Sequence, residues 1–89
     1  MAKHKMSWEE VIYIVKVGIG IRRARQATSM TQQDLADKLG VTKFTIGLYE
    51  RGDLRISAFN LSRIAAITNT PIEQIINANN PHTKAEDHE

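Results

Sequence analysis

Residues 31–52 of this 89-residue chain read TQQDLADKLGVTKFTIGLYERG, and this segment has the clearest pattern of helix signals in the sequence. Its apolar residues recur at intervals of three and four, which is the period of an amphipathic helix. Thr31 and Asp34 have a spacing close to that of a capping box, and Gly40 and Gly52 follow two apolar stripes as stop signals. The pattern therefore predicts two short helices, 32–39 and 43–51, separated by about three residues.

Three residues of this pair have defined physical roles. Ala36 allows two helices to approach closely, Gly40 takes a left-handed turn without a Cβ penalty, and Ile46 anchors the second helix in a core. Two helices that cross at about 90–120° leave the outer face of the second helix available to a DNA major groove. Residues 32–51 are accordingly predicted to form a helix-turn-helix unit.

Start and stop signals on either side of this unit predict three more helices. Ser7 with Glu10 precedes a segment at 8–27, Ser57 precedes one at 58–68, and Thr70 with Pro71 precedes one at 71–78. The predicted fold class is all-α, with five helices.

The segment at 8–27 has a second interpretation. Its run VIYIVKVGIGI, residues 11–21, is rich in β-branched residues that favour a strand. Gly18 and Gly20 would each cost a helix roughly 1 kcal/mol. A helix, straight or bent at the glycines, is still favoured, because no second strand exists to satisfy the backbone of a first.

Length and charge limit the class of protein. A chain of 89 residues forms one small domain, and the absence of cysteine excludes disulfides, thiolate zinc sites and a cysteine nucleophile. Residues 16–55 contain eight basic and four acidic side chains, a net charge of +4, whereas residues 81–89 carry −2. The positive field of the chain is therefore concentrated on its centre, which favours an anionic partner.

Several functions are not expected from this sequence. The apolar run at 11–21 is interrupted by Lys16 and has about half of the ~20 residues that a membrane span needs, so a cytoplasmic, nucleoid-associated protein is predicted. Residues 7–79 are expected to form the domain, between disordered ends at 1–6 and 80–89. We find no catalytic residue arrangement, metal site or cofactor motif, and the chain is predicted not to be an enzyme. His82 and His88 are interpreted as part of a solvated tail.

The ordered series of motifs resembles the Cro/C1-type (XRE-like) helix-turn-helix family of bacterial and phage transcriptional regulators. The resemblance runs without a gap from about residue 17 to residue 76. The matching segments are IRRAR at 21–25, MTQQDLA at 30–36, KLGV at 38–41, Ile46, YERG at 49–52, IA at 64–65 and PIEQII at 71–76. The resemblance implies a lambda-repressor-like domain that binds double-stranded DNA.

The resemblance also implies roles for individual residues. Gln32 would bind a DNA phosphate, and Arg25 with Glu50 would form a structural salt bridge. The groove-facing residues would be Thr42, Lys43, Phe44, Gly47 and Leu48, while Thr45, Arg51 and Arg55 would lie near the DNA backbone. Lys43 could donate to guanine, whereas Phe44 and Leu48 could contact thymine methyls. Phe44, Gly47 and Leu48 stand where many relatives have polar readers, so apolar contacts, close backbone approach or DNA shape would contribute to recognition.

The first predicted helix begins about nine residues before the usual first helix of the family. The additional apolar residues either extend the core over the last helix or form a surface for a partner. The candidate dimer interface comprises Trp8, Val11, Ile12, Val15, Phe59, Ile72, Ile75 and Ile76. The predicted function is a homodimeric regulator, a repressor in the favoured interpretation, on a near-palindromic operator. The alternatives are an antitoxin or restriction-modification controller that also binds a protein partner, and an interaction module with a vestigial helix-turn-helix.

Overall fold

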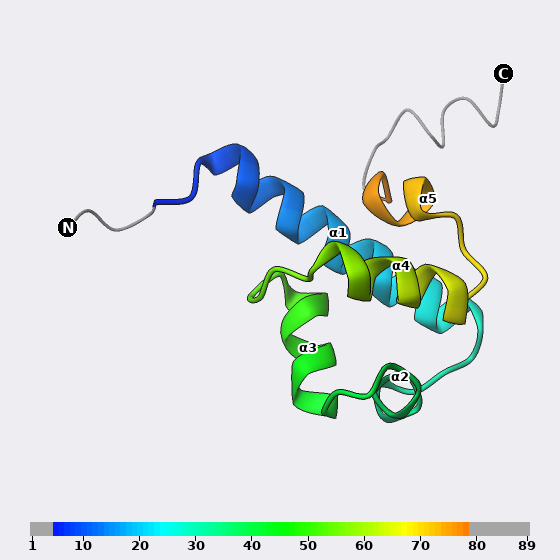
Figure 1. The fold of residues 1–89 in the computed structure, drawn as a ribbon. Coiled ribbons are helices and arrows are strands. Elements are labelled where there is room, and N and C mark those ends of the chain that lie inside the picture. The colour runs from blue at the N-terminus through cyan, green and yellow to red at the C-terminus, as the bar shows by residue number, and fades with distance from the viewer. Residues whose placement is uncertain (1–4, 79–89) are drawn as a thin grey trace, which may run out of the picture.

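The computed structural model describes residues 5–78, and every regular element in that range is a helix (Figure 1). The helices are α1 (Trp8–Ala27), α2 (Gln32–Leu39), α3 (Lys43–Arg51), α4 (Ala58–Ile67) and α5 (Ile72–Ile76). The predicted all-α fold with five helices is therefore confirmed, although α4 ends one residue early and α5 is shorter than expected. None of these helices is long and apolar enough to cross a membrane. The expected tail at 80–89 and residues 1–4 lie outside the described range.

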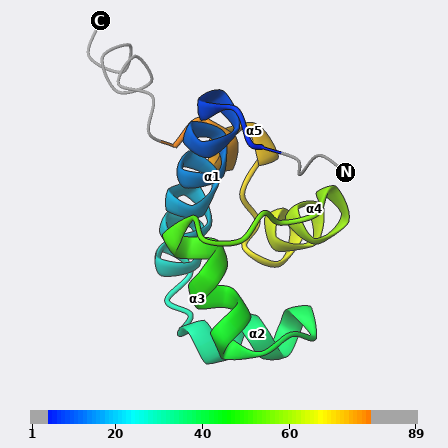
Figure 2. The same cartoon turned by 90° about the vertical axis from the view of Figure 1, so that its left-hand side faces the viewer.

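Helix α1 is the longest helix, and two of the other helices are packed on it. Helices α3 and α5 pack directly on it, α2 packs on α3 and α4, and α4 also contacts α5. Figures 1 and 2 show α2 and α3 together at one end of the molecule and α5 at the opposite end. The first turns of α1, dark blue in Figure 1, extend beyond the other helices. The helix-turn-helix unit and the N-terminal extension are thus both prominent features of the surface.

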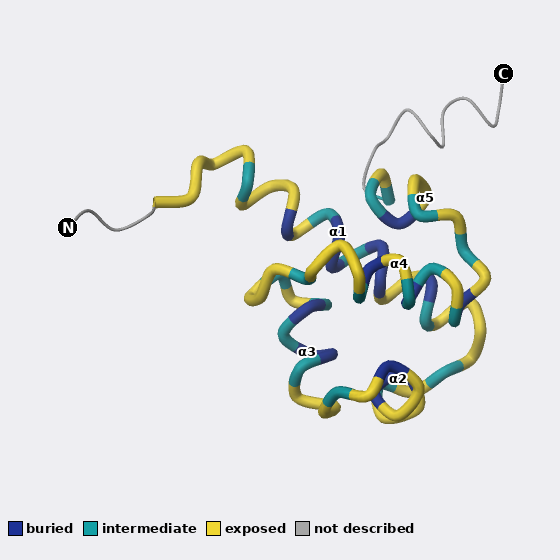
Figure 3. The backbone as a smooth tube through the Cα atoms, viewed as in Figure 1, coloured by how far each residue is buried: buried dark blue, intermediate teal, exposed yellow. Residues whose placement is uncertain are grey.

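The core receives one large, fully buried aliphatic side chain from each helix. These five side chains are Ile21, Leu35, Ile46, Ile64 and Ile75. Figure 3 shows that the buried positions lie where the helices face one another, whereas the first turns of α1 are largely exposed. Burial of each such side chain contributes about 1.5–3 kcal/mol, so every helix contributes to the stability of this small core.

Helix ends agree with the local signals at most positions. The Ser7 and Thr31 hydroxyls accept from the backbone N–H of Glu10 and Asp34 in complete capping boxes, and Gly40 is left-handed, with φ of 81°. Hydrogen bonds from Thr31 hold the pKa of the Asp34 carboxyl below its usual value. The predicted cap at Thr70 is wrong. Its hydroxyl donates to the carbonyl oxygen of Thr68, and α5 begins after an N-cap at Pro71 that makes no side-chain cap bond.

Helix α1 is continuous through Gly18 and Gly20, which excludes the strand interpretation. A Cβ on Gly18 would lie 2.8 Å from the carbonyl oxygen of Glu50, on α3. A Cβ on Gly20 would lie 2.6 Å from the carbonyl carbon of Ile75, on α5. The helix-propensity cost of the two glycines is therefore offset by close backbone packing of α3 and α5 on α1.

Candidate nucleic-acid interface

The turn between α2 and α3 fixes how the second helix is presented. The backbone N–H groups of Gly40 and Val41 both donate to the carbonyl oxygen of Ala36, at 2.8 and 3.0 Å. Ala36 and Ile46 are fully buried, as their predicted roles in close approach and anchoring require. Because Ile46 and Tyr49 turn the inner face of α3 to the core, the opposite face of this helix is left on the surface.

The outer face of α3 carries most of the residues that the sequence assigned to the DNA groove. Lys43 is exposed, Phe44 is 69% exposed and Leu48 is partly exposed. Gly47 lies on the same face by helical spacing but is buried, because the Arg51 side chain covers it. The outer face of α3 is thus a mixed surface of two cations, two apolar side chains and one covered glycine.

Thr42 and Thr45 interact with each other at the start of α3. The Thr42 hydroxyl accepts from the Thr45 backbone N–H at 3.1 Å, and the two hydroxyl oxygens are 3.0 Å apart. These contacts fix the first turn of the helix that presents Lys43. Contact of either threonine with DNA stays a prediction.

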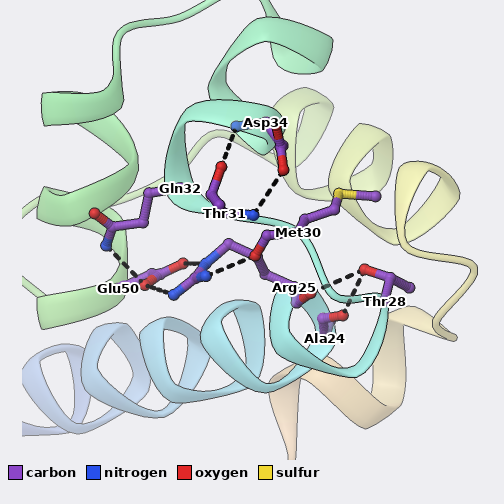
Figure 4. Close-up of polar contacts among 8 residues, drawn as sticks. All are labelled: Ala24, Arg25, Thr28, Met30, Thr31, Gln32, Asp34 and Glu50. Carbon is purple, nitrogen blue, oxygen red and sulfur yellow. Dashed lines mark hydrogen bonds and ion pairs between the residues drawn. The ribbon is translucent and has the colours of Figure 1, made fainter.

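A hydrogen-bond network joins the first three helices (Figure 4). Arg25 Nε and Nη2 donate to the two carboxylate oxygens of Glu50 at 2.6 and 3.0 Å, and Arg25 Nη1 donates to the Met30 carbonyl oxygen at 2.9 Å. The two side chains are only 11% and 4% exposed. The bond to Glu50 raises the pKa of Arg25 above its usual value. This pair is the structural salt bridge that the resemblance implied.

Gln32 is also part of this network, which sequence reasoning missed. Its Nε2 donates to Glu50 Oε1 at 3.0 Å, so one of the two side-chain N–H groups is engaged within the protein (Figure 4). Gln32 is also the first residue of α2, where backbone N–H groups at a helix N-terminus can bind phosphate. The phosphate contact predicted for Gln32 stays a prediction, and the structure adds a second role in orienting Glu50.

The remaining cations near α3 have protein partners. Arg51 Nε donates to Asp53 Oδ2 at 3.1 Å, and Arg55 pairs with Glu10 on α1. Arg63, which the sequence did not single out, donates from Nη1 to the Leu39 carbonyl oxygen at 2.8 Å. Arg63 thus satisfies the end of α2 from a position 24 residues away, and no local spacing predicts such a contact.

The candidate dimer residues divide into two groups in the structure. Trp8, Val11, Ile12, Val15 and Phe59 are exposed, Trp8 to 73%. Ile72 and Ile76 are half-buried against the core, and Ile75 is 1% exposed. Ile75 was therefore wrongly placed on the surface, because its side chain is the core contribution of α5. Among residues 8–15 only Ile14 is buried, and the alternative that the extension continues the core over α5 stays a prediction.

Taken together, the α2–turn–α3 unit, its buried anchors and its exposed second helix define a helix-turn-helix protein. A family model described as Helix-turn-helix matches residues 21–75, which is more than half of the chain. The chain belongs to the Cro/C1-type helix-turn-helix family. Its fold is that of the DNA-binding domain of this family.

Relatives and solved structures agree with this assignment. The chain is 38% identical over 58 residues to an uncharacterized HTH-type transcriptional regulator of Sinorhizobium medicae; the match covers 65% of this chain and 42% of that relative. The chain thus spans about two fifths of the length of the curated relatives it matches. The restriction-modification controller protein C.AhdI from Aeromonas hydrophila matches with 27% identity and a TM-score of 0.65, over 70% of this chain and 94% of its own.

A more distant match supports the fold alone. The clp gene regulator ClgR from Corynebacterium glutamicum matches with 18% identity and a TM-score of 0.72. This match covers 85% of the present chain and 83% of that chain. The similarity therefore extends over most of both chains.

Proposed function

We propose that the chain is a sequence-specific regulator of transcription that binds double-stranded DNA and presents the outer face of α3 to the major groove. This assignment rests on membership of the helix-turn-helix family and on the name of the matched rhizobial relative, an HTH-type transcriptional regulator. The favoured mode of action is repression, in which the bound protein occupies a near-palindromic operator.

The charge at the start of α3 is the observation that best supports DNA binding by this helix. Helices α1, α2 and α5 each have an acidic residue in the first turn, where it complements the positive end of the helix dipole. Helices α3 and α4 have none, and of these two α3 begins with a cation, Lys43. A cation at this position is unfavourable in the isolated protein, whereas a bound polyanion would attract both the cation and the positive end of the helix.

Replacing Lys43 with glutamine is expected to stabilise the isolated domain by about 0.3–1 kcal/mol, because a cation leaves the positive end of α3. The same change is expected to weaken DNA binding and alter the preferred base, because the ammonium group no longer donates in the groove. Thermal unfolding and fluorescence anisotropy with labelled duplexes measure the two effects.

Lys38→Gln is the matched control for this prediction, since Lys38 lies in the last turn of α2, where a cation is favourable. Its unfolding free energy is expected to fall by a few tenths of a kcal/mol. Equal losses of Lys43→Gln affinity on operator and random duplexes would contradict the base-reading role.

Selection of bound duplexes from a random pool tests the proposed function directly. The expected result is an enriched sequence with two related half-sites, bound with an affinity that falls steeply as salt increases. Absence of both enrichment and salt-dependent binding would overturn the proposal and favour the vestigial helix-turn-helix alternative.

A second copy of the chain is the partner proposed for the exposed face of α1. Trp8, Val11, Ile12, Val15 and Ile19 follow the spacing i, i+3, i+4, i+7 and i+11, which places them on one stripe of the helix. Glu9 and Lys16, seven residues apart, lie on the same edge of this stripe. An antiparallel pair of α1 helices would therefore bring opposite charges together, which favours a two-fold dimer.

Ile12→Glu is expected to convert the dimer to a monomer at micromolar concentration, because it places a charge in the middle of the paired stripe. Sedimentation equilibrium measures the change, and operator affinity is expected to fall with it. Phe59, on α4, is the other exposed residue of the candidate interface but lies outside the α1 stripe. If α1 alone pairs, Phe59→Glu is expected to leave the dimer intact. A wild-type protein that is monomeric at this concentration would contradict the proposed dimer.

The alternative of an antitoxin or a controller of restriction and modification is not favoured. One matched structure is a restriction-modification controller protein, but another matched structure is a clp gene regulator with the same fold. The shared domain therefore does not select the controller function. The additional protein partner of that alternative is likewise not needed to account for the exposed α1 stripe.

A further inference from the structure

Arg51 is the last residue of α3, yet its guanidinium does not lie at the end of the helix. The Arg51 Nη1 atom lies 3.2 Å from the position that a Cβ on Gly47 would occupy, one turn earlier. Side chains of a helix lean toward its N-terminus, and the missing side chain at Gly47 leaves space for this long one. The guanidinium therefore lies across the middle of the outer face of α3.

Asp53 orients this guanidinium from the loop that follows α3. Arg51 Nε donates to Asp53 Oδ2 at 3.1 Å, and both side chains are exposed. Within residues 5–78, neither Nη1 nor Nη2 of Arg51 donates a hydrogen bond to another part of the protein. The terminal N–H donors of a planar, permanently charged fork are thus directed to the surface.

The neighbours of Arg51 favour a base over a phosphate as its partner. Phe44 and Leu48 share the outer face of α3 and are apolar, while Lys43 is a single-point donor on a flexible stem. Arg51 is the one arginine of α3, and its fork matches the O6 and N7 acceptors of guanine in the major groove. A side chain near the centre of a groove-facing surface lies closer to base edges than one at its rim.

We propose that Arg51 reads a guanine in the major groove, with Asp53 as its positioning residue and Gly47 as the opening that lets the guanidinium reach the centre of α3. This inference rests on the proposed function and differs from the backbone contact that the sequence assigned to Arg51. In this inference Gly47 leaves space for the Arg51 side chain, whereas the sequence had suggested that Gly47 allows close approach to DNA.

The test compares Arg51→Lys with the wild-type protein on two duplexes. The first duplex is the sequence that the wild type selects from a random pool, and the second has the selected G·C pair replaced by A·T. Arg51→Lys keeps the charge and removes the fork, so it is expected to lose about tenfold or more in affinity on the first duplex. On the second duplex its loss is expected to be less than about twofold.

Variants at Gly47 and Asp53 test whether these residues position the Arg51 guanidinium or only change the charge near the DNA. Gly47→Ala is expected to lower the ratio of the two affinities without lowering the melting temperature. Asp53→Ala is expected to lower the same ratio, although removal of an acid near DNA by itself would raise affinity for both duplexes equally. A ratio unchanged in both variants would overturn the positioning roles.

Equal losses of Arg51→Lys on both duplexes would overturn the inference and assign Arg51 to a phosphate. That result leaves the proposed function standing, since the wild type would still have selected a sequence. Failure of the wild type to select any sequence would instead overturn the proposed function, and the inference with it.

Discussion

Gly20→Ala is expected to lower the free energy of unfolding by about 2 kcal/mol or more, and the melting temperature by roughly 8–16 °C. A Cβ at this position would meet the backbone of Ile75: its carbonyl oxygen, its carbonyl carbon at 2.6 Å and its Cα at 2.8 Å. Backbone atoms cannot rotate away as a side chain can, so α5 would have to move off α1. Its fully buried Ile75 side chain would then leave the core. Thermal unfolding followed by circular dichroism measures the loss.

The same substitution at Gly47 is the matched control. Gly47 is also inside a helix, but its Cβ would meet only the end of the flexible Arg51 side chain. Gly47→Ala is therefore expected to stabilise the domain by about 0.4–1 kcal/mol, because alanine restricts the unfolded chain more than glycine does. If Gly20→Ala were as stable as Gly47→Ala, the close packing of α5 on α1 would be contradicted.

These two glycines illustrate what the sequence could predict about the fold. Helix starts at Ser7 and Thr31 and the turn at Gly40 depend on residues within four positions of one another, so local spacing was sufficient. The glycine at position 20 is explained only by its close approach to Ile75, 55 residues later. Considered alone, the low helix propensity of glycine favoured a strand, which is the wrong element. Ile75 was placed on the surface for the same reason, since helical spacing does not say which face of a five-residue helix meets α1.

The candidate site divides in the same way. Helical spacing placed Lys43, Phe44 and Leu48 on one outer face of α3, because three residues on a single short helix need no tertiary information. The bond from Gln32 to Glu50 and the path of Arg51 over Gly47 depend on how side chains are directed in three dimensions. The Arg25–Glu50 pair could be predicted only from the resemblance to a family, since its two members are 25 residues apart and no local spacing relates them.

Glu50→Ala is expected to be among the most destabilising single changes in this domain, at about 3 kcal/mol or more. The Glu50 side chain is 4% exposed and accepts hydrogen bonds from Arg25 on α1 and Gln32 on α2. Its removal leaves a poorly solvated guanidinium without its counter-charge, and this penalty exceeds the loss of the bonds themselves. Chemical denaturation measures the change in unfolding free energy.

The exposed pair of Arg51 and Asp53 provides the control for this prediction. Both members are more than half exposed, so Asp53→Ala is expected to cost less than about 1 kcal/mol.

Arg25→Met combined with Glu50→Leu removes both charges from the buried site and is expected to recover most of the stability that Glu50→Ala loses. If Glu50→Ala cost no more than Asp53→Ala, Glu50 would not hold α1, α2 and α3 together. The position of α3 would then have to depend on the buried side chains of Ile46 and Tyr49 and on the close approach of α3 to α1 at Gly18.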